Sequence, residues 1–145
     1  MKKYKRYVLQ VALWLGLVVT AHPVLAQDAV IGYVKTAQDD ANLVVDGKTV
    51  KAQPGMPVQV GYVLKTGKPG SLGVTFRDNT MVSIGPDTEM VVDEYLFAPA
   101  KGELKLAATL VKGTLQYISG VIAKLKPEAV TVKTPVGIIG VRGTR

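Results

Sequence analysis

The chain has 145 residues, a formal net charge of +7 at neutral pH and an apolar fraction of 48%, which together suit one ordinary globular domain. It contains no cysteine and a single histidine, His22. Disulfides, Cys/His zinc sites and Ser–His or Cys–His nucleophilic pairs are therefore excluded from everything after that residue.

The first 26 residues have the three-part pattern of a secretory signal peptide. The start is positively charged, an apolar run covers residues 11–20, and the small residues of Val24-Leu25-Ala26 fit a cleavage site; the charged residues are Lys2, Lys3, Lys5 and Arg6. An uncleaved membrane anchor is the alternative, but the run is shorter than the roughly 20 residues that a membrane span needs. We therefore expect cleavage after Ala26 and a periplasmic or secreted protein.

Removal of this peptide changes the charge of the remaining chain. Residues 1–26 carry four of the 18 Lys+Arg and none of the 11 Asp+Glu, so 14 basic residues face 11 acidic ones and the net charge falls to +3. Such a mild, dispersed excess gives no reason to expect nucleic acid as a partner. We expect contact with a membrane only through the signal peptide before cleavage, and no cofactor.

The remaining chain is expected to form an all-β fold, because turn signals recur about every 8–12 residues. Asp46-Gly47 predicts a tight hairpin between residues 43–45 and 49–51. Residues 71–77 alternate apolar and polar side chains, as a half-buried strand does. Loops are expected at Asp39-Asp40, at residues 66–70 and at residues 93–102, where Tyr95, Leu96 and Phe97 are expected to pin the longest loop onto the core.

Residues 103–125 fit both strand and helix periodicity. We expect strands over residues 103–111 and 114–118, then a short helical turn over residues 119–125 that Pro127 ends. Val130 and Val132 are expected to open one final strand. The predicted fold is a small all-β domain of many short strands, a twisted solenoid or sandwich, with at most one helical turn near residues 119–125. No exact sequence period repeats, so identical coils are not expected.

The closing residues 134–145 read TPVGIIGVRGTR and place Gly137, Gly140 and Gly143 among β-branched residues. A bulged or strongly turned strand explains this pattern. Such a last strand could also leave an open sheet edge that accepts an added strand. Arg142 is either a surface charge or a clamp whose guanidinium binds carbonyls or a carboxylate of neighbouring turns.

The order of these features resembles the FecR domain, a module of bacterial envelope proteins. Asn79 stands where that family often has glycine, and asparagine is the usual substitute in a left-handed backbone. The resemblance covers roughly residues 50–145 and rests on the segments 60–67, 71–76, 78–80, 84–86, 110–118, 134–135 and 141–144.

The resemblance implies an all-β periplasmic domain of solenoid-like shape. We expect a signal peptide over residues 1–26, N-terminal strands over 27–50 and a FecR-like domain over 51–145. Founding members of the family are membrane-spanning anti-sigma regulators, and because residues 1–145 show neither a cytoplasmic N-terminal domain nor an internal transmembrane helix, we expect the FecR-like module here without the anti-sigma role. The matching motif residues, given a structural role, are Thr66, Gly67, Asp78, Thr134, Pro135, Gly140, Arg142, Gly143 and Thr144.

Three functions compete at this stage. The first is a non-catalytic interaction or signalling module that binds another envelope protein or a cell-wall polymer. The second is a glycan-processing enzyme that uses carboxylates alone, with the pairs Asp39/Asp40, Asp87/Glu89 and Asp93/Glu94 available. The third is a calcium-binding β domain with Asp78, Asn79 and Asp87 as oxygen ligands.

Overall fold

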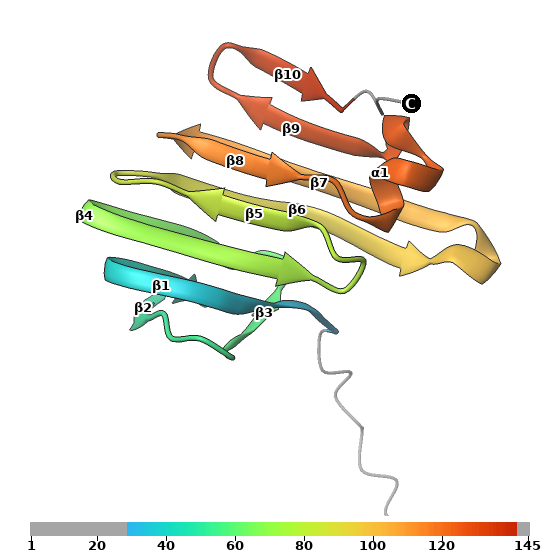
Figure 1. Cartoon of the computed structure of the whole chain (residues 1–145). Helices are drawn as coiled ribbons and strands as arrows, with labels where there is room; N and C mark the ends of the chain where they lie inside the picture. Colours follow the sequence, from blue (N-terminus) through green and yellow to red (C-terminus); the bar gives the residue numbers. More distant parts are fainter. Residues whose placement is uncertain (1–28, 142–145) are drawn as a thin grey trace, which may run out of the picture.

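The computed structural model describes residues 29–141, which form ten strands, one α-helix and two 3-10 turns (Figure 1). In chain order these are β1 (Val30–Val45), β2 (Lys48–Lys51), β3 (Pro57–Gln59), β4 (Val63–Phe76), β5 (Met81–Ile84), β6 (Glu89–Ala98), η2 (Pro99–Lys101), β7 (Glu103–Lys112), β8 (Leu115–Ile118), α1 (Val121–Leu125), η3 (Pro127–Ala129), β9 (Val130–Thr134) and β10 (Gly137–Gly140). The predicted all-β class with a short helical turn is confirmed.

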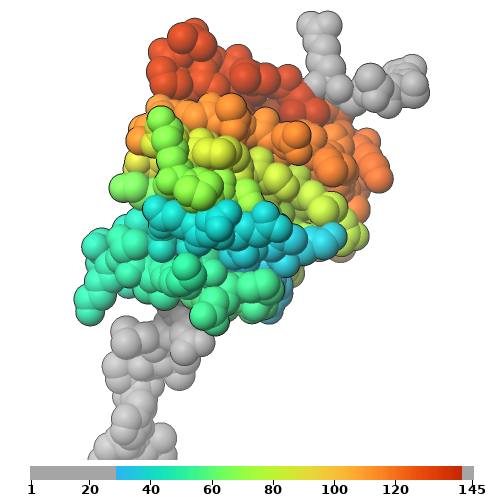
Figure 2. Space-filling view, turned by 60° about the vertical axis from the view of Figure 1, so that its left-hand side comes forward, coloured from blue at the N-terminus to red at the C-terminus, as the bar shows by residue number. Residues whose placement is uncertain are grey.

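Two long strands, β1 and β4, pair antiparallel along their whole length and run through both layers of the domain. The first part of β4 pairs with β6, and its last part pairs with β5. We call β2-β1-β4-β6-β7-β9-β10 the first layer and β3-β1-β4-β5-β8 the second layer. Figure 2 shows β2 and β3 at one end of the molecule, outside β1, and the bands from β1 onward then follow one another to the β9–β10 hairpin at the other end.

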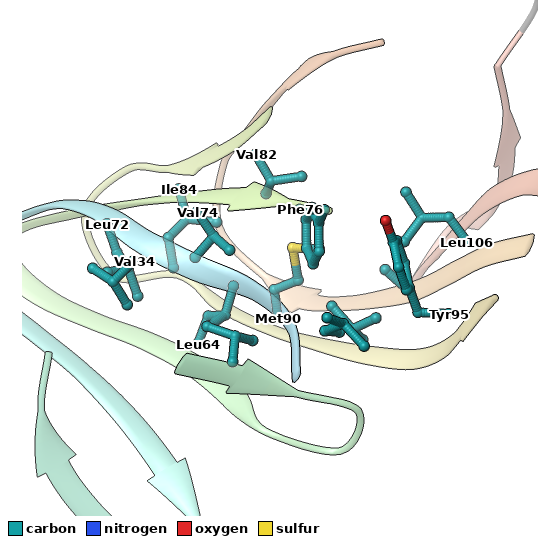
Figure 3. Close-up of a cluster of buried hydrophobic side chains, with 14 of the residues drawn as sticks. Val34, Leu64, Leu72, Val74, Phe76, Val82, Ile84, Met90, Tyr95 and Leu106 are labelled. Carbon is teal, nitrogen blue, oxygen red and sulfur yellow. The ribbon is translucent and has the colours of Figure 1, made fainter. Parts of the chain in front are cut away.

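The core lies between the layers and follows from strand alternation. In the last part of β4, Leu72, Val74 and Phe76 point inward and are at most 2% exposed. The rings of Phe76 and Tyr95 stack with centroids 5.6 Å apart, and Met90 lies beside them (Figure 3). Burial of each such side chain stabilises the fold by about 1.5–3 kcal/mol.

Several local predictions are confirmed. The Asp46-Gly47 hairpin joins β1 to β2, and both residues have positive φ angles, +50° and +77°, as the favoured two-residue hairpin turn requires. The expected strand over residues 103–111 corresponds to β7, and α1 occupies the expected helical turn, with Pro127 just beyond it. This five-residue helix is the longest described, and none of the described helices has the length and apolarity needed to cross a membrane.

The loops predicted at Asp39-Asp40 and at residues 66–70 are wrong. Both segments lie inside the long strands β1 and β4, where Asp39 pairs with Gly70. The register shifts between Asp39 and Ala41, and Asp39 has a φ of +56°, so the segment forms a β-bulge. These residues, which are typical of turns, thus bend β1 and β4 where the two strands pass from one layer to the other, and both strands continue beyond the bend.

Two further boundaries differ from the sequence prediction. The loop expected over residues 93–102 is wrong, because β6 continues to Ala98 and η2 with Gly102 makes the only turn before β7. The single final strand is also wrong, because β9 and β10 form a hairpin in which Gly137 pairs with Thr134. Within its turn, the Thr134 hydroxyl donates to the Gly137 carbonyl at 3.0 Å.

Candidate functional site

Three threonines hold together the edge of the domain where the chain changes layers. The Thr66 hydroxyl donates to the Gly85 carbonyl at 2.6 Å and accepts from the Thr88 amide at 3.0 Å. One level further along, the Thr88 hydroxyl donates to the Pro86 carbonyl and accepts from the Thr114 amide, both at 3.0 Å. We call Thr66, Thr88 and Thr114 the threonine ladder. Its hydrogen bonds join the start of β4 to the start of β6, and the start of β6 to the start of β8.

Glycine and ion pairs complete this edge. Gly113 has a φ of +97°, and a Cβ there would lie 2.6 Å from Thr88 Cα, so no other residue fits. Asp87 forms ion pairs with Lys112 at 3.1 Å and Lys68 at 3.6 Å. The hydrogen bond and the positive charge of Lys112 hold the pKa of Asp87 below its ordinary value.

Asp78 ties down the opposite edge, at the turn between β4 and β5. The residue is fully buried. Its Oδ1 accepts from the Tyr95 hydroxyl at 2.8 Å and the Thr80 amide at 3.3 Å, and its Oδ2 accepts from the Thr80 hydroxyl at 2.7 Å. Oδ2 also accepts from the Ile122 amide at 3.1 Å, in the first turn of α1. One carboxylate therefore joins the turn, the strand β6 and the helix.

Tyr95 is the second half of this buried network. Its hydroxyl accepts from the Asp78 amide at 3.0 Å while it donates to the carboxylate of the same residue. Burial, and then the hydrogen bond to Asp78, raise the pKa of Tyr95 far above its ordinary value of 10.0. The aromatic residue expected in a loop thus lies in strand β6 and pins it to the core.

The described residues give no support to a calcium site. The oxygens of Asp78 already accept four hydrogen bonds, and Asp87 is paired with two lysines. Within residues 29–141 there is no group of three or more acidic or His/Cys side chains placed to hold a metal ion.

Each candidate carboxylate pair has at least one member engaged with a neighbouring side chain. Asp93 accepts a hydrogen bond from the Thr109 hydroxyl at 2.6 Å, and Glu94 forms an ion pair with Lys105 at 2.9 Å. Asp40 accepts a hydrogen bond from the side-chain amide of Asn42 at 2.6 Å. A general acid needs a raised pKa, whereas that of Asp87 is lowered. These contacts are those of surface and strand-pairing charges.

The end of the stack formed by β8 and β10 is open. In the part of the chain that the structure describes, β10 pairs only with β9 and β8 pairs only with β5, so each presents a free edge. An apolar cavity of about 280 Å³ lies between them, and we call it the end groove. Its lining is Leu110, Leu115, Tyr117, Val132, Thr134, Ile139 and Val141.

The predicted motif residues separate into three places. Thr66 and Gly67 belong to the layer-changing edge, and Asp78 to the opposite edge. Thr134, Pro135 and Gly140 lie in the β9–β10 hairpin beside the end groove. Arg142, Gly143 and Thr144 lie outside the described residues, so the clamp expected of Arg142 stays a prediction.

Sequence reasoning missed Thr88, Thr114 and the hydrogen bonds of Tyr95 to Asp78, although it expected Tyr95 to pack onto the core. The available signal was the recurrence of threonine within two residues of glycine or proline at intervals of 22 and 26 residues. Tyr117 was also missed: it lines the end groove, and burial raises its pKa.

The geometry defines a small two-layer all-β domain with one open end and no assembled set of catalytic groups among the described residues. Comparison with known families assigns this domain to one family. The model of the family described as "FecR protein" matches residues 62–145, more than half of the chain, and the protein belongs to the FecR family. Proteins of this family are associated with the bacterial envelope, and their FecR domain generally serves signalling without catalysis. Searches of curated proteins and of solved structures returned no match.

Proposed function

We propose that the protein is an exported, non-catalytic interaction module of the bacterial envelope, which binds a partner protein by accepting an extended strand at its open end. The observation that carries this proposal is the pair of free edges, β8 and β10, on either side of an apolar groove. Added strands gain main-chain hydrogen bonds from such an edge and specificity from pockets for alternate side chains.

Strand β10 has the properties of an accepting edge. All four of its residues are exposed, and it contains no charged or proline residue that would discourage pairing. Ile139 faces the end groove and Ile138 the solvent, and they are 58% and 69% exposed. A partner strand at this edge would cover apolar surface that the fold leaves in water.

The opposite end of the stack is protected. Strand β2 is the outer strand of the first layer there and carries Lys48 and Lys51 at its two ends, and the outer strand of the second layer, β3, is three residues long and begins with Pro57. Charged side chains, lysine above all, are a common means of blocking strand addition at an edge. The contrast between β2 and β10 favours specific strand addition at one end over non-specific association at any exposed sheet edge.

Two sequence observations support the rest of the proposal. The pattern of residues 1–26 supports export, and the absence of His and Cys after residue 26 removes the commonest catalytic side chains. Fractionation of cells that express the tagged full chain tests export directly. Recovery of an unprocessed chain in the cytoplasm would contradict it.

Site-specific photocrosslinking tests the binding end. A photoreactive residue at Ile138 should capture a defined envelope protein, and the substitution Ile139→Lys should abolish capture without lowering the melting temperature. The matched control is a photoreactive residue at Val50 on the protected strand β2, which is 42% exposed and should capture nothing. Equal capture from both positions would refute a specific end. Capture of a second copy alone would replace the partner by self-association.

A further inference from the structure

The solvent face of the second layer differs in chemistry from the rest of the surface. Cross-strand pairing aligns Thr36, Gly73, Ser83 and Gln116 in one row across β1, β4, β5 and β8. The neighbouring row aligns Tyr33, Thr75, Met81 and Ile118 on the same strands. We call these two rows the hydroxyl face. At a strand spacing of about 4.8 Å, each row is roughly 14 Å long.

The two rows carry hydroxyl, amide and apolar groups and no charge. The first layer offers a contrast, because there the cross-strand row of Lys65, Glu89 and Lys112 alternates in sign. Strands β6 and β9 of this layer add Asp93 and Lys133, both exposed. A charged ligand would find its counter-ions on the first layer. The hydroxyl face instead suits an uncharged ligand that both donates and accepts hydrogen bonds.

Two shallow depressions adjoin each other on this face and share Ser83. One of about 280 Å³ is lined by the polar side chains of Ser71, Ser83, Thr114 and Gln116, and one of about 130 Å³ lies over Gly73, where Lys35 is the one charged residue of the lining. Both are at or below the usual range of roughly 300–1,000 Å³ for pockets that enclose a small molecule. Their shape suits an extended ligand that lies across the strands.

One buried group in the smaller depression lacks a partner. Thr75 lines this depression, and its Oγ1 atom is buried without a hydrogen bond to any described residue. An unpaired buried hydroxyl costs about 1–3 kcal/mol, so the fold alone gives no reason for threonine here rather than valine. A ligand hydroxyl in the depression would supply the missing partner once the Thr75 side chain turns its Oγ1 atom, which is closed to solvent here, toward the ligand.

Tyr33 adds an aromatic surface to the same row. It is 52% exposed and pairs across the strands with Thr75. A pyranose ring presents an apolar C–H face and a rim of hydroxyls, and the hydroxyl face offers an aromatic ring beside serine, threonine and glutamine. These are complementary chemistries.

We propose that the hydroxyl face binds an extended, uncharged polysaccharide. Hydroxyl and amide side chains of the central row hold the sugar hydroxyls, and the exposed ring of Tyr33 packs against a sugar face. The row length accommodates more than one sugar unit. This site lies on the outer surface of the second layer and adjoins the end groove, with Leu115 lining both, so the protein would join a polymer and a protein partner at neighbouring sites.

Calorimetric titration of the purified protein tests the proposal with two probes, cellohexaose and the hexamer of N-acetylglucosamine. Both present pyranose hydroxyls, and the two arms distinguish a plain glucan from an N-acetylated wall-type glycan. Binding of at least one probe is expected. The substitutions Tyr33→Ala and Gln116→Ala should each weaken it about five-fold or more, as loss of one contact of about 1 kcal/mol does.

The controls separate binding from folding. Thr49→Ala on the first layer removes an exposed hydroxyl elsewhere and should leave binding unchanged. Thr75→Val should weaken binding without lowering the melting temperature, which a purely structural role of the hydroxyl does not predict. Ile139→Lys at the end groove should leave glycan binding intact, so this proposal and the proposed function fail independently. Absence of binding to both hexamers at millimolar concentration, or unchanged binding in both Tyr33→Ala and Gln116→Ala, would overturn the proposal.

Discussion

The substitution Asp78→Asn should destabilise the domain although it changes the side-chain volume very little. The carboxylate accepts four hydrogen bonds, two of them from the main-chain amides of Thr80 and Ile122. An asparagine amide has one oxygen and one NH₂ group. The two main-chain amides bind different carboxylate oxygens, so either orientation of the asparagine places its NH₂ group against one of them.

The magnitude follows from the hydrogen bonds that are lost. One buried N–H without an acceptor costs about 1–3 kcal/mol. The remaining bonds also lose the extra strength that a charged acceptor gives them, while the cost of burying a charge is relieved. We expect a net loss of about 2–4 kcal/mol, a large share of the roughly 5–15 kcal/mol that holds a typical domain together.

Urea unfolding of the wild-type and Asp78→Asn proteins measures this loss. The matched control is Asp46→Asn, because Asp46 lies in the exposed hairpin turn and has a positive φ that asparagine adopts well. The control should change the unfolding free energy by less than about 0.5 kcal/mol. If Asp78→Asn were equally neutral, the carboxylate would not hold the turn, β6 and α1 together in the way described.

Three further predictions follow from the same contacts. The fold raises the pKa of Tyr95, so the stability that the neutral Tyr95 hydroxyl contributes is complete below the unfolded pKa of about 10 and is lost as pH rises toward the folded pKa. Thermal melts above pH 10 should therefore show a fall in melting temperature, and the substitution Tyr95→Phe should make that fall smaller. Thr88→Val leaves the Thr114 amide without an acceptor and should cost about 1–3 kcal/mol in urea unfolding. Gly113→Ala should lower the melting temperature well below that of Gly47→Ala, because both have positive φ but only Gly113 would place a Cβ against Thr88; equal melting temperatures would contradict this crowding.

The strands were predictable wherever one face is buried and the other wet. The alternation around Leu72, Val74 and Phe76 and the Asp-Gly hairpin are local signals, and both predictions are confirmed. The predicted loops at Asp39-Asp40 and residues 66–70 failed for the opposite reason. Turn residues there serve a bulge between two long strands, and pairing between distant residues decides that outcome.

The contacts that hold the edges were less predictable because they join residues far apart in the sequence. Thr66 and Thr88 are 22 residues apart, and Asp78 reaches Ile122 across 44 residues. Family resemblance singled out Thr66 and Asp78 but named no partner for either. The hydroxyl face was invisible to sequence reasoning, because its rows exist only once four strands are placed in register.

The two ends of the stack explain how such a small domain could connect other molecules. A stack of strands can grow at either end, and here lysines protect β2 while β10 and β8 leave an apolar groove open. The threonine ladder and the Asp78 network lie along the two sides and fix the stack between these ends. The outer surfaces of the two layers then differ in charge: the first layer carries a charged cross-strand row, and the two rows of the hydroxyl face carry no charge. Such a stack can offer its open end to a protein and the adjoining hydroxyl face to a polymer, and Leu115 lies where the two sites meet.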